Sequence, residues 1–171
     1  LKSQIRIGLE EIRKIIFNLR PMALDDLGLV PTLRKFVQDF EEKTRIRAVF
    51  ETSGKEKRLP GAMEAAMYRL VQEGFNNALK HAQSTFVSLE LVFLEQTVQM
   101  YIEDNGVGFV PEAVQARNKS HSHFGLIGMK ERVELLQGKM EIESTVGHGT
   151  VIKINVPIKA ESRKELIAHG D

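Results

Sequence analysis

The sequence predicts a two-layer α/β sandwich, in which a mixed sheet of about five strands carries three helices on one face. Two observations predict this class. Segments with apolar residues at helical spacing alternate along the chain with shorter segments rich in β-branched and aromatic residues. Strand-like segments in the second half of the chain also come in pairs joined by short turns, which is typical of antiparallel neighbours. At 171 residues, the chain can bury the core of one such domain.

Composition narrows the range of partners. Lys and Arg number 24 against 23 Asp and Glu, and the net charge of +1 offers no overall attraction to nucleic acid or to an anionic membrane. Cysteine is absent, which excludes disulfides and thiolate metal sites and suits the reducing cytoplasm. No apolar run approaches the roughly 20 residues that cross a bilayer. We therefore expect a cytoplasmic chain without direct nucleic acid or membrane contact.

The first 21 residues carry a heptad pattern. Apolar residues recur at spacings of four and three, at Ile5, Leu9, Ile12, Ile16 and Leu19. Such a narrow seam predicts a helix of a bundle, although a plain amphipathic helix lying on the domain's own core fits the periodicity equally well. Pro21 ends this helix. Because the chain starts at Leu1 inside the pattern, we expect it to be part of a longer protein.

The elements that follow build the first half of the predicted domain. Asp25–Gly28 is predicted to be a polar turn, and residues 29–44 a helix with Pro31 in its first turn. Residues 46–52 alternate as a strand does, and residues 53–58 form a charged loop. Pro60 then opens a long helix that reaches about residue 82.

The second half of the domain is predicted to contain two strand pairs and one helix. Residues 85–94 and 98–103 form an antiparallel pair, and the polar residues 110–123 form a mobile loop. A helix follows Phe124–Met129, continues to about residue 136 and ends at Gly138. The last elements are strands at 140–144 and 150–156, followed by a polar tail at 159–171.

The long helix carries the first candidate site. Glu73 and Asn77 are four residues apart, so their side chains share one helix face at a distance of about 6 Å. A carboxylate and an amide oxygen are hard ligands that suit Mg²⁺, which takes few protein ligands and keeps several waters. Lys80 and His81, one turn later, can reach phosphate oxygens. A solvated polar helix face is the alternative explanation for this motif taken alone.

Three glycine-containing motifs add independent support. Asp104 ends a strand and precedes Gly106 and Gly108, so its carboxylate can accept from an exocyclic amine while the glycines allow close approach to the backbone. A hairpin turn is the alternative here. Gly125, Leu126, Gly128 and Met129 stand just before a helix, where free amides favour an anion. Gly147-His148-Gly149-Thr150 is the fourth motif, and taken alone it fits a glycine turn.

Taken together, the four motifs resemble the ATP-binding domain of bacterial sensor histidine kinases. The motifs in order are Glu-x-x-x-Asn-Ala-x-Lys-His, Asp-x-Gly-x-Gly, Gly-Leu-x-Gly-Met and Gly-x-Gly-Thr. This domain is a branch of the Bergerat-fold ATPases, which include gyrase, MutL and the heat-shock 90 chaperones. The segments Asn18–Leu29 and Met129–Val133 are similar to the DegS-type branch, which pairs with response regulators of the NarL/LuxR type. The resemblance covers about residues 5–158.

The resemblance implies a role for each matching residue. Asn77 would coordinate Mg²⁺ on the triphosphate, and Glu73 beside it would orient the metal's water or polarise the reaction. Asp104 would accept a hydrogen bond from the adenine amino group, supported by Thr150. The remaining cofactor-binding residues would line the nucleotide or its phosphates: Lys80, His81, Gly106, Gly108, Gly125, Leu126, Gly128, Met129 and Gly149. Residues 110–123 would form a lid over the phosphates.

The implied function is transfer of the γ-phosphoryl group of ATP to a histidine, and from there to a response regulator. The family's acceptor histidine is usually followed by an acidic residue on the first dimerisation helix, and none of the five histidines of this chain fits that description. We therefore expect the acceptor upstream of Leu1, in a protein that is a homodimer at full length. Residues 1–21 would end the second dimerisation helix, residues 22–158 would form the catalytic domain, and residues 159–171 would form a tail.

Two other function classes remain open on the same fold. One is a serine kinase of the anti-sigma-factor type, which shares the ATP site but lacks a dimerisation helix such as residues 1–21. The other is a non-enzymatic module in which the nucleotide only switches conformation.

Overall fold

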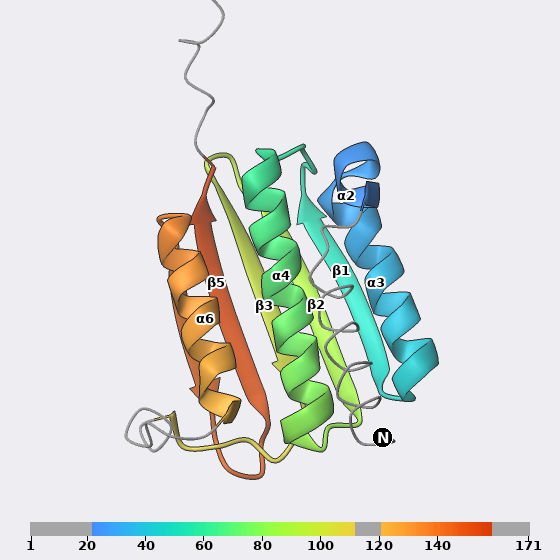
Figure 1. Ribbon diagram of the computed structural model, residues 1–171, viewed down its shortest axis with the longest axis vertical. Coiled ribbons are helices and arrows are strands. Elements are labelled where there is room, and N and C mark those ends of the chain that lie inside the picture. The colour runs from blue at the N-terminus through green and yellow to red at the C-terminus, as the bar shows by residue number, and fades with distance from the viewer. Residues whose placement is uncertain (1–21, 112–120, 159–171) are drawn as a thin grey trace, which may run out of the picture.

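The computed structural model describes residues 22–111 and 121–158. The predicted bundle helix at 1–21, most of the predicted lid and the polar tail at 159–171 lie outside the described residues. Within them, the chain forms a sheet covered on one face by helices (Figure 1). This arrangement confirms the predicted two-layer α/β sandwich.

The sheet has five strands in the order β1-β2-β3-β5-β4. β1 pairs in parallel with β2, and the other neighbours are antiparallel, so the sheet is mixed as predicted. The strand bounds are β1 Arg47–Gly54, β2 Phe86–Phe93, β3 Thr97–Asp104, β4 Lys139–Ser144 and β5 Thr150–Pro157. The parallel pairing of β1 with β2 requires a crossover, and the long helix between them provides it.

Helices α3, α4 and α6 lie side by side on one face of the sheet (Figure 1). The described helices are α2 Met22–Leu27, α3 Leu29–Thr44, α4 Gly61–Asn77, the π-helix η1 Ala78–Ala82 and α6 His121–Leu135. The predicted helices at 29–44 and 60–82 are confirmed, except that the last turn of the second is a π-helix.

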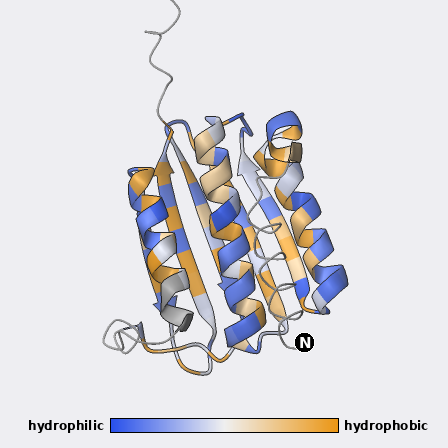
Figure 2. Ribbon diagram, viewed as in Figure 1, coloured by the Kyte–Doolittle hydropathy of each residue, from blue (hydrophilic) through white to orange (hydrophobic). Residues whose placement is uncertain are grey.

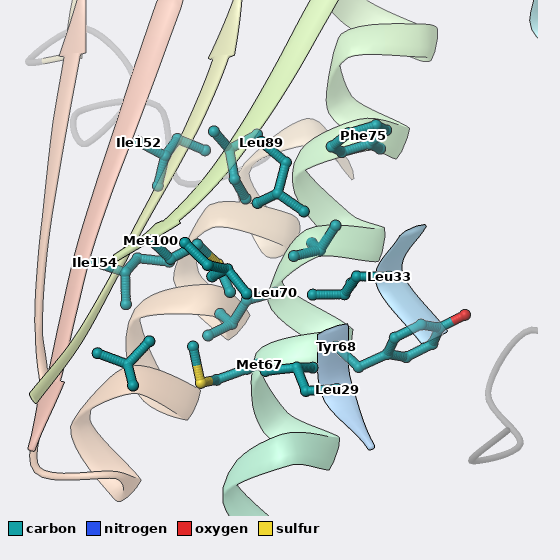
Figure 3. Packing of buried hydrophobic residues seen from close by; sticks show 14 of the residues in the cluster. Leu29, Leu33, Met67, Tyr68, Leu70, Phe75, Leu89, Met100, Ile152 and Ile154 are labelled. Atoms are coloured by element: carbon teal, nitrogen blue, oxygen red, sulfur yellow. The ribbon is translucent and has the colours of Figure 1, made fainter. Parts of the chain in front are cut away.

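The core lies between the sheet and these helices. Hydrophobic and hydrophilic residues alternate along the strands (Figure 2), and the hydrophobic set points toward the helices. Figure 3 shows how α3, α4 and three strands contribute to this layer through Leu29, Leu33, Met67, Leu70, Phe75, Leu89, Met100, Ile152 and Ile154. The ring of Phe75 packs edge-on against Phe40 at a centroid distance of 5.0 Å, which joins α4 to α3.

Three local predictions were wrong. Asp25–Gly28 was expected to be a polar turn, but residues 22–27 form α2, whose Leu24 is fully buried. The strand β1 extends to Gly54, into the expected charged loop. The segment Gly125–Met129 was expected before a helix, but α6 begins at His121 and includes it.

A buried carboxylate explains why α2 is stable. Glu64, in the first turn of α4, is 1% exposed and accepts hydrogen bonds from the backbone N–H of Leu59 and from Arg58 Nε at 3.1 and 3.2 Å. The same Arg58 donates through Nη2 to the carbonyls of Leu24 and Asp25. One guanidinium therefore contacts the last carbonyls of α2 and Oε1 of Glu64 together, while Glu64 Oε2 has no hydrogen-bond partner among the described residues.

We predict that Arg58→Met lowers the free energy of unfolding by about 1–2 kcal/mol, because it leaves the charge of Glu64 buried without its cation. The loss is smaller than for a fully buried pair because the Arg58 side chain is 57% exposed. In a Glu64→Gln background the same substitution costs less, since no charge remains to be neutralised. Urea unfolding of the four proteins in this double-mutant cycle measures the difference, and equal losses in both backgrounds would contradict the coupling.

Candidate functional site

The candidate site lies where the end of α4 meets the end of β3. Helix α4 approaches the sheet closely at Gly74, where a Cβ atom would stand 2.8 Å from Ile102 Cδ1 of β3. This contact places the last turn of α4 beside the loop that follows Asp104. Residues that are 30 positions apart in the sequence thus come to one end of the domain.

Glu73 and Asn77 share the face of α4 that meets α6, as their spacing predicts. Gly125 of α6 lies directly against them: a Cβ atom at this position would collide with Glu73 Oε1 and stand 3.5 Å from Asn77 Oδ1. Both side chains are half-buried. Gly125, which the sequence placed among the phosphate-binding residues, thus lies beside the carboxylate and the amide, and a helix rather than a loop brings it there.

The amide of Asn77 has an unmet bonding requirement. Its Nδ2 is buried and has no hydrogen-bond partner among the described residues. A buried donor without an acceptor costs free energy, so this nitrogen needs a partner such as a water, an ion or a ligand. Because the oxygen and nitrogen of an amide exchange places by a simple flip, this side chain suits either a phosphate oxygen or a metal.

The π-helix η1 connects α4 to β2 and contacts the loop that follows β3. Its residues Lys80 and His81 are exposed to solvent at the open end of the site. Its last carbonyl, that of Ala82, accepts a hydrogen bond of 2.8 Å from the backbone N–H of Val107. The neighbouring Gly106 packs closely on Ala82. A Cβ atom at residue 106 would stand 2.3 Å from the same backbone oxygen, so a side chain does not fit there.

Asp104 is a half-buried carboxylate at the end of β3. Its Oδ1 accepts a hydrogen bond of 2.8 Å from the backbone N–H of Gly106, and the structure describes no cation beside it. Burial raises the pKa of Asp104, the Gly106 hydrogen bond opposes this, and the charge of Glu103 adds to the rise. A desolvated carboxylate with acceptor capacity left over can bind a neutral N–H donor.

The turn between β4 and β5 closes the site from the other side. Thr150 is the register partner of Asp104, and Gly149 before it has φ +82°, a conformation that a side chain would strain. Gly149 also lies against the Asp104 carbonyl, where a Cβ atom would collide. Gly108 contacts the same turn at the carbonyl of Thr145. The Asp104–Gly108 loop is therefore fixed between η1 and this turn.

Two residues that the sequence analysis missed hold this loop in place. Asn105 Oδ1 accepts from the backbone N–H groups of Thr85 and Phe86, both at 3.0 Å. Ser144 Oγ accepts from the backbone N–H of Phe109 at 2.9 Å and lies 3.0 Å from Thr150 Oγ1. The Asp-Asn-Gly sequence was a usable signal for Asn105, because asparagine side chains commonly bond nearby backbone in turns. Ser144 carried no comparable signal.

The other residues of the Gly125–Met129 motif do not lie against Glu73 and Asn77. Met129 is fully buried and belongs to the hydrophobic core, and Leu126 packs partly against that core. Gly128 faces open space, since a Cβ atom there would meet nothing within 4 Å. The structure thus brings Gly125, but not the whole motif, to Glu73 and Asn77.

The described residues contain neither a cluster of metal-ligating side chains nor a helix that could span a membrane. No group of three or more His, Cys, Asp or Glu side chains there could hold a metal ion. A metal at Asn77 would thus take most of its ligands from a bound molecule or from water, as Mg²⁺ commonly does. None of the described helices is long and apolar enough to cross a membrane.

Comparisons with known proteins agree with this geometry. The chain is 43% identical over 161 residues to the signal transduction histidine-protein kinase/phosphatase DegS of Brevibacillus brevis, an alignment covering 94% of this chain and 40% of that protein. It is 46% identical over 162 residues to DegS of Bacillus subtilis, covering 92% and 41%. The chain thus spans about two fifths of the length of these curated relatives.

A solved structure and a family model extend the comparison. The histidine kinase domain of the Erythrobacter litoralis EL346 blue-light activated histidine kinase superposes with a TM-score of 0.61 at 19% identity, over 76% of this chain and 65% of that one. This likeness confirms the expected Bergerat-type fold. The model for the histidine kinase-, DNA gyrase B- and HSP90-like ATPases matches residues 62–160, from the start of α4 past the end of β5. On this match, the chain belongs to the histidine kinase-, DNA gyrase B- and HSP90-like ATPase family.

Proposed function

We propose that this chain binds ATP with Mg²⁺ and donates the γ-phosphoryl group to a histidine on a dimerisation helix outside it. The observation that carries the proposal is the buried amide nitrogen of Asn77, which lacks a hydrogen-bond partner within the described part of the chain and lies on the same helix face as Glu73. The DegS relatives, named as histidine-protein kinases, support this chemistry. We further propose a homodimer at full length and a response regulator of the NarL/LuxR type as the next acceptor.

Asp104 selects the base in this proposal. Its desolvated carboxylate accepts a hydrogen bond from the exocyclic amine of adenine, while guanine presents a carbonyl at that position and would be repelled. The hydrogen bond from Gly106 holds the carboxylate in one orientation. Thr150, held next to Ser144, supports the same contact, and Gly106, Gly108 and Gly149 leave room for the ring.

Asn77 and Glu73 act at the phosphate end. The residues present fit a magnesium ion shared with the triphosphate, because Asn77 offers one amide and Glu73 one carboxylate beside it. Bound Mg²⁺ neutralises phosphate charge. Asn77 would hold the ion through its amide oxygen, Glu73 would orient water beside it, and the exposed Lys80 and His81 would approach the phosphates. Catalysis then rests on positioning and charge neutralisation, as is general for phosphoryl transfer.

We predict that Asp104→Ala abolishes measurable ATP binding, whereas Asn77→Ala retains part of the affinity and loses phosphotransfer. The reason is that Asp104 contacts the base and Asn77 the metal and phosphates. Isothermal calorimetry measures binding, and radiolabelled ATP with the dimerisation helix supplied measures transfer. Glu103→Ala is the matched control, since this exposed neighbour points to the other face of the sheet. Unchanged affinity in Asp104→Ala would refute the site.

The same labelling experiment separates the function classes. Label on histidine is lost in acid, whereas label on serine is retained, as a serine kinase of the anti-sigma-factor type would show. Binding without any transfer would instead favour the nucleotide-switched module.

We predict that Gly125→Ala slows phosphotransfer at least tenfold without destabilising the fold, because the new methyl group displaces the flexible end of Glu73. Gly128→Ala adds the same methyl to the same helix in open space and should leave the rate near that of the wild type. Both substitutions raise helix propensity equally. Equal rates for the two variants would exclude a role for the Glu73 position.

We predict that Asp104→Asn makes the nucleotide-free protein more stable at pH 7. A carboxyl whose pKa is raised by folding binds its proton more tightly in the native state, so stability falls as pH rises from about 4 through the raised pKa. Asparagine keeps the acceptor for the Gly106 N–H and removes the ionisation. Urea unfolding at pH 7 and below pH 4 tests this, because the stability gain should vanish at the lower pH. An equal gain at both would contradict it.

A further inference from the structure

Three polar side chains form one row across the end of the sheet. Ser144 of β4 is the register partner of Thr150 of β5, and Thr150 is the register partner of Asp104 of β3. Residues paired in this way point to the same face of a sheet, with Cβ atoms about 5 Å apart. The next row toward the middle of the sheet is apolar throughout and belongs to the core: Leu89, Ile102, Ile152 and Ile142. The polar row therefore stands where the core ends and the candidate site begins.

The hydroxyl of Ser144 makes three short contacts. Its Oγ accepts a hydrogen bond of 2.9 Å from the backbone N–H of Phe109, and it donates one of 2.9 Å to the carbonyl of Gly149. It also lies 3.0 Å from Thr150 Oγ1. Because a hydroxyl has one proton and two lone pairs, these three contacts use the whole hydrogen-bonding capacity of Ser144.

The number of protons fixes the direction of the contact between Ser144 and Thr150. A carbonyl carries no proton, so the hydrogen atom between Ser144 and the Gly149 oxygen comes from Ser144. That proton is then not available to Thr150. Two hydroxyl oxygens 3.0 Å apart share a hydrogen atom, and Thr150 supplies it. The Thr150 hydroxyl thus donates to Ser144 and keeps only lone pairs for any other partner.

We propose that Ser144 is a specificity-determining residue that acts by positioning the hydroxyl of Thr150. With its proton held by Ser144, Thr150 presents an acceptor beside the carboxylate of Asp104. Two neighbouring acceptors fit a primary amine, which has two N–H donors, and they repel a carbonyl oxygen. This inference rests on the proposed function and deepens it, because the amino group of adenine is then recognised through both of its N–H bonds.

Burial makes the direction of this hydroxyl matter. Thr150 is only 8% exposed, so water does not readily replace a donor that a bound base fails to supply. A base with a carbonyl in place of the amine would set its oxygen against both acceptors. Without the Ser144 hydroxyl, Thr150 would be free to rotate and to donate its own proton to that carbonyl. Ser144 therefore decides whether the second contact selects for the amine or tolerates the carbonyl.

The test measures the ratio of the calorimetric Kd for inosine triphosphate to that for ATP, because inosine carries a carbonyl where adenosine carries the amine. We expect Ser144→Ala to lower this ratio about tenfold, since the freed Thr150 hydroxyl donates to the carbonyl. Ser144→Thr keeps a hydroxyl and should retain most of the ratio. Ser88→Ala is the matched control: it removes a serine hydroxyl beside Glu103, on the other face of the sheet, and should leave the ratio at the wild-type value.

A second background separates positioning from loop stability. Thr150→Val removes the hydroxyl on which Ser144 acts, so Ser144→Ala should not change the ratio further in that background. Ser144 also binds the backbone N–H of Phe109, and an effect transmitted through that loop would appear equally in both backgrounds.

The wild-type protein provides a measurement that needs no variant. An ATP analogue whose amine carries one methyl group has a single N–H, and we expect it to bind about tenfold more weakly than ATP. The role of Ser144 is overturned by an unchanged ratio in Ser144→Ala, by an equal fall with and without the Thr150 hydroxyl, or by an analogue that binds as tightly as ATP. In each of these cases the wild type still binds ATP and the proposed function stands, whereas a wild type that binds no ATP refutes the proposed function itself.

Discussion

The close approach of α4 to β3 determines the rest of the candidate site. Gly74 is buried at this contact, and a larger residue would push against Ile102 and lift the helix from the sheet. Around it, Met67, Leu70, Val71 and Phe75 have no exposed surface, so the helix cannot shift without opening the core. Asn77 and the Asp104 loop thus take their separation from packed hydrophobic side chains. A site supported in this way is formed before any ligand arrives.

The sequence predicted most elements because their patterns are local. The five strands and the helices α3 and α4 follow from side-chain period, and Glu73 with Asn77 follows from the spacing of one helical turn. Helix α2 was missed because its last carbonyls are satisfied by Arg58, more than 30 residues later in the chain. The early start of α6 was missed because its first residues are polar and Gly125 and Gly128 normally interrupt helices. Glycine at 125 is explained only by Glu73, a tertiary neighbour.

Two carboxylates that are withdrawn from water have different roles. Glu64 is almost fully buried, but it has Arg58 and the Leu59 amide as partners, and its place at the start of α4 is structural. Asp104 is less buried, yet no described cation compensates it, and burial raises its pKa. A protein that needed only stability would favour a neutral residue at 104. The desolvated charge at this position is therefore consistent with a role in binding, which the proposed adenine contact supplies.

The π-helix η1 has a consequence for the history of this domain. A π-helix has i→i+5 hydrogen bonds and usually forms a single turn within an α-helix, so that it holds one residue more than an α-helical turn does. Here the π-helical turn lies between Asn77 and Gln83, after the side chains of the site and before the strand that follows. An insertion there advances the chain toward the Asp104 loop and leaves Glu73 and Asn77 on their original face. Sequence alignments of this family should accordingly place single-residue gaps within residues 78–82, where length can change between relatives while the upstream helix keeps its register.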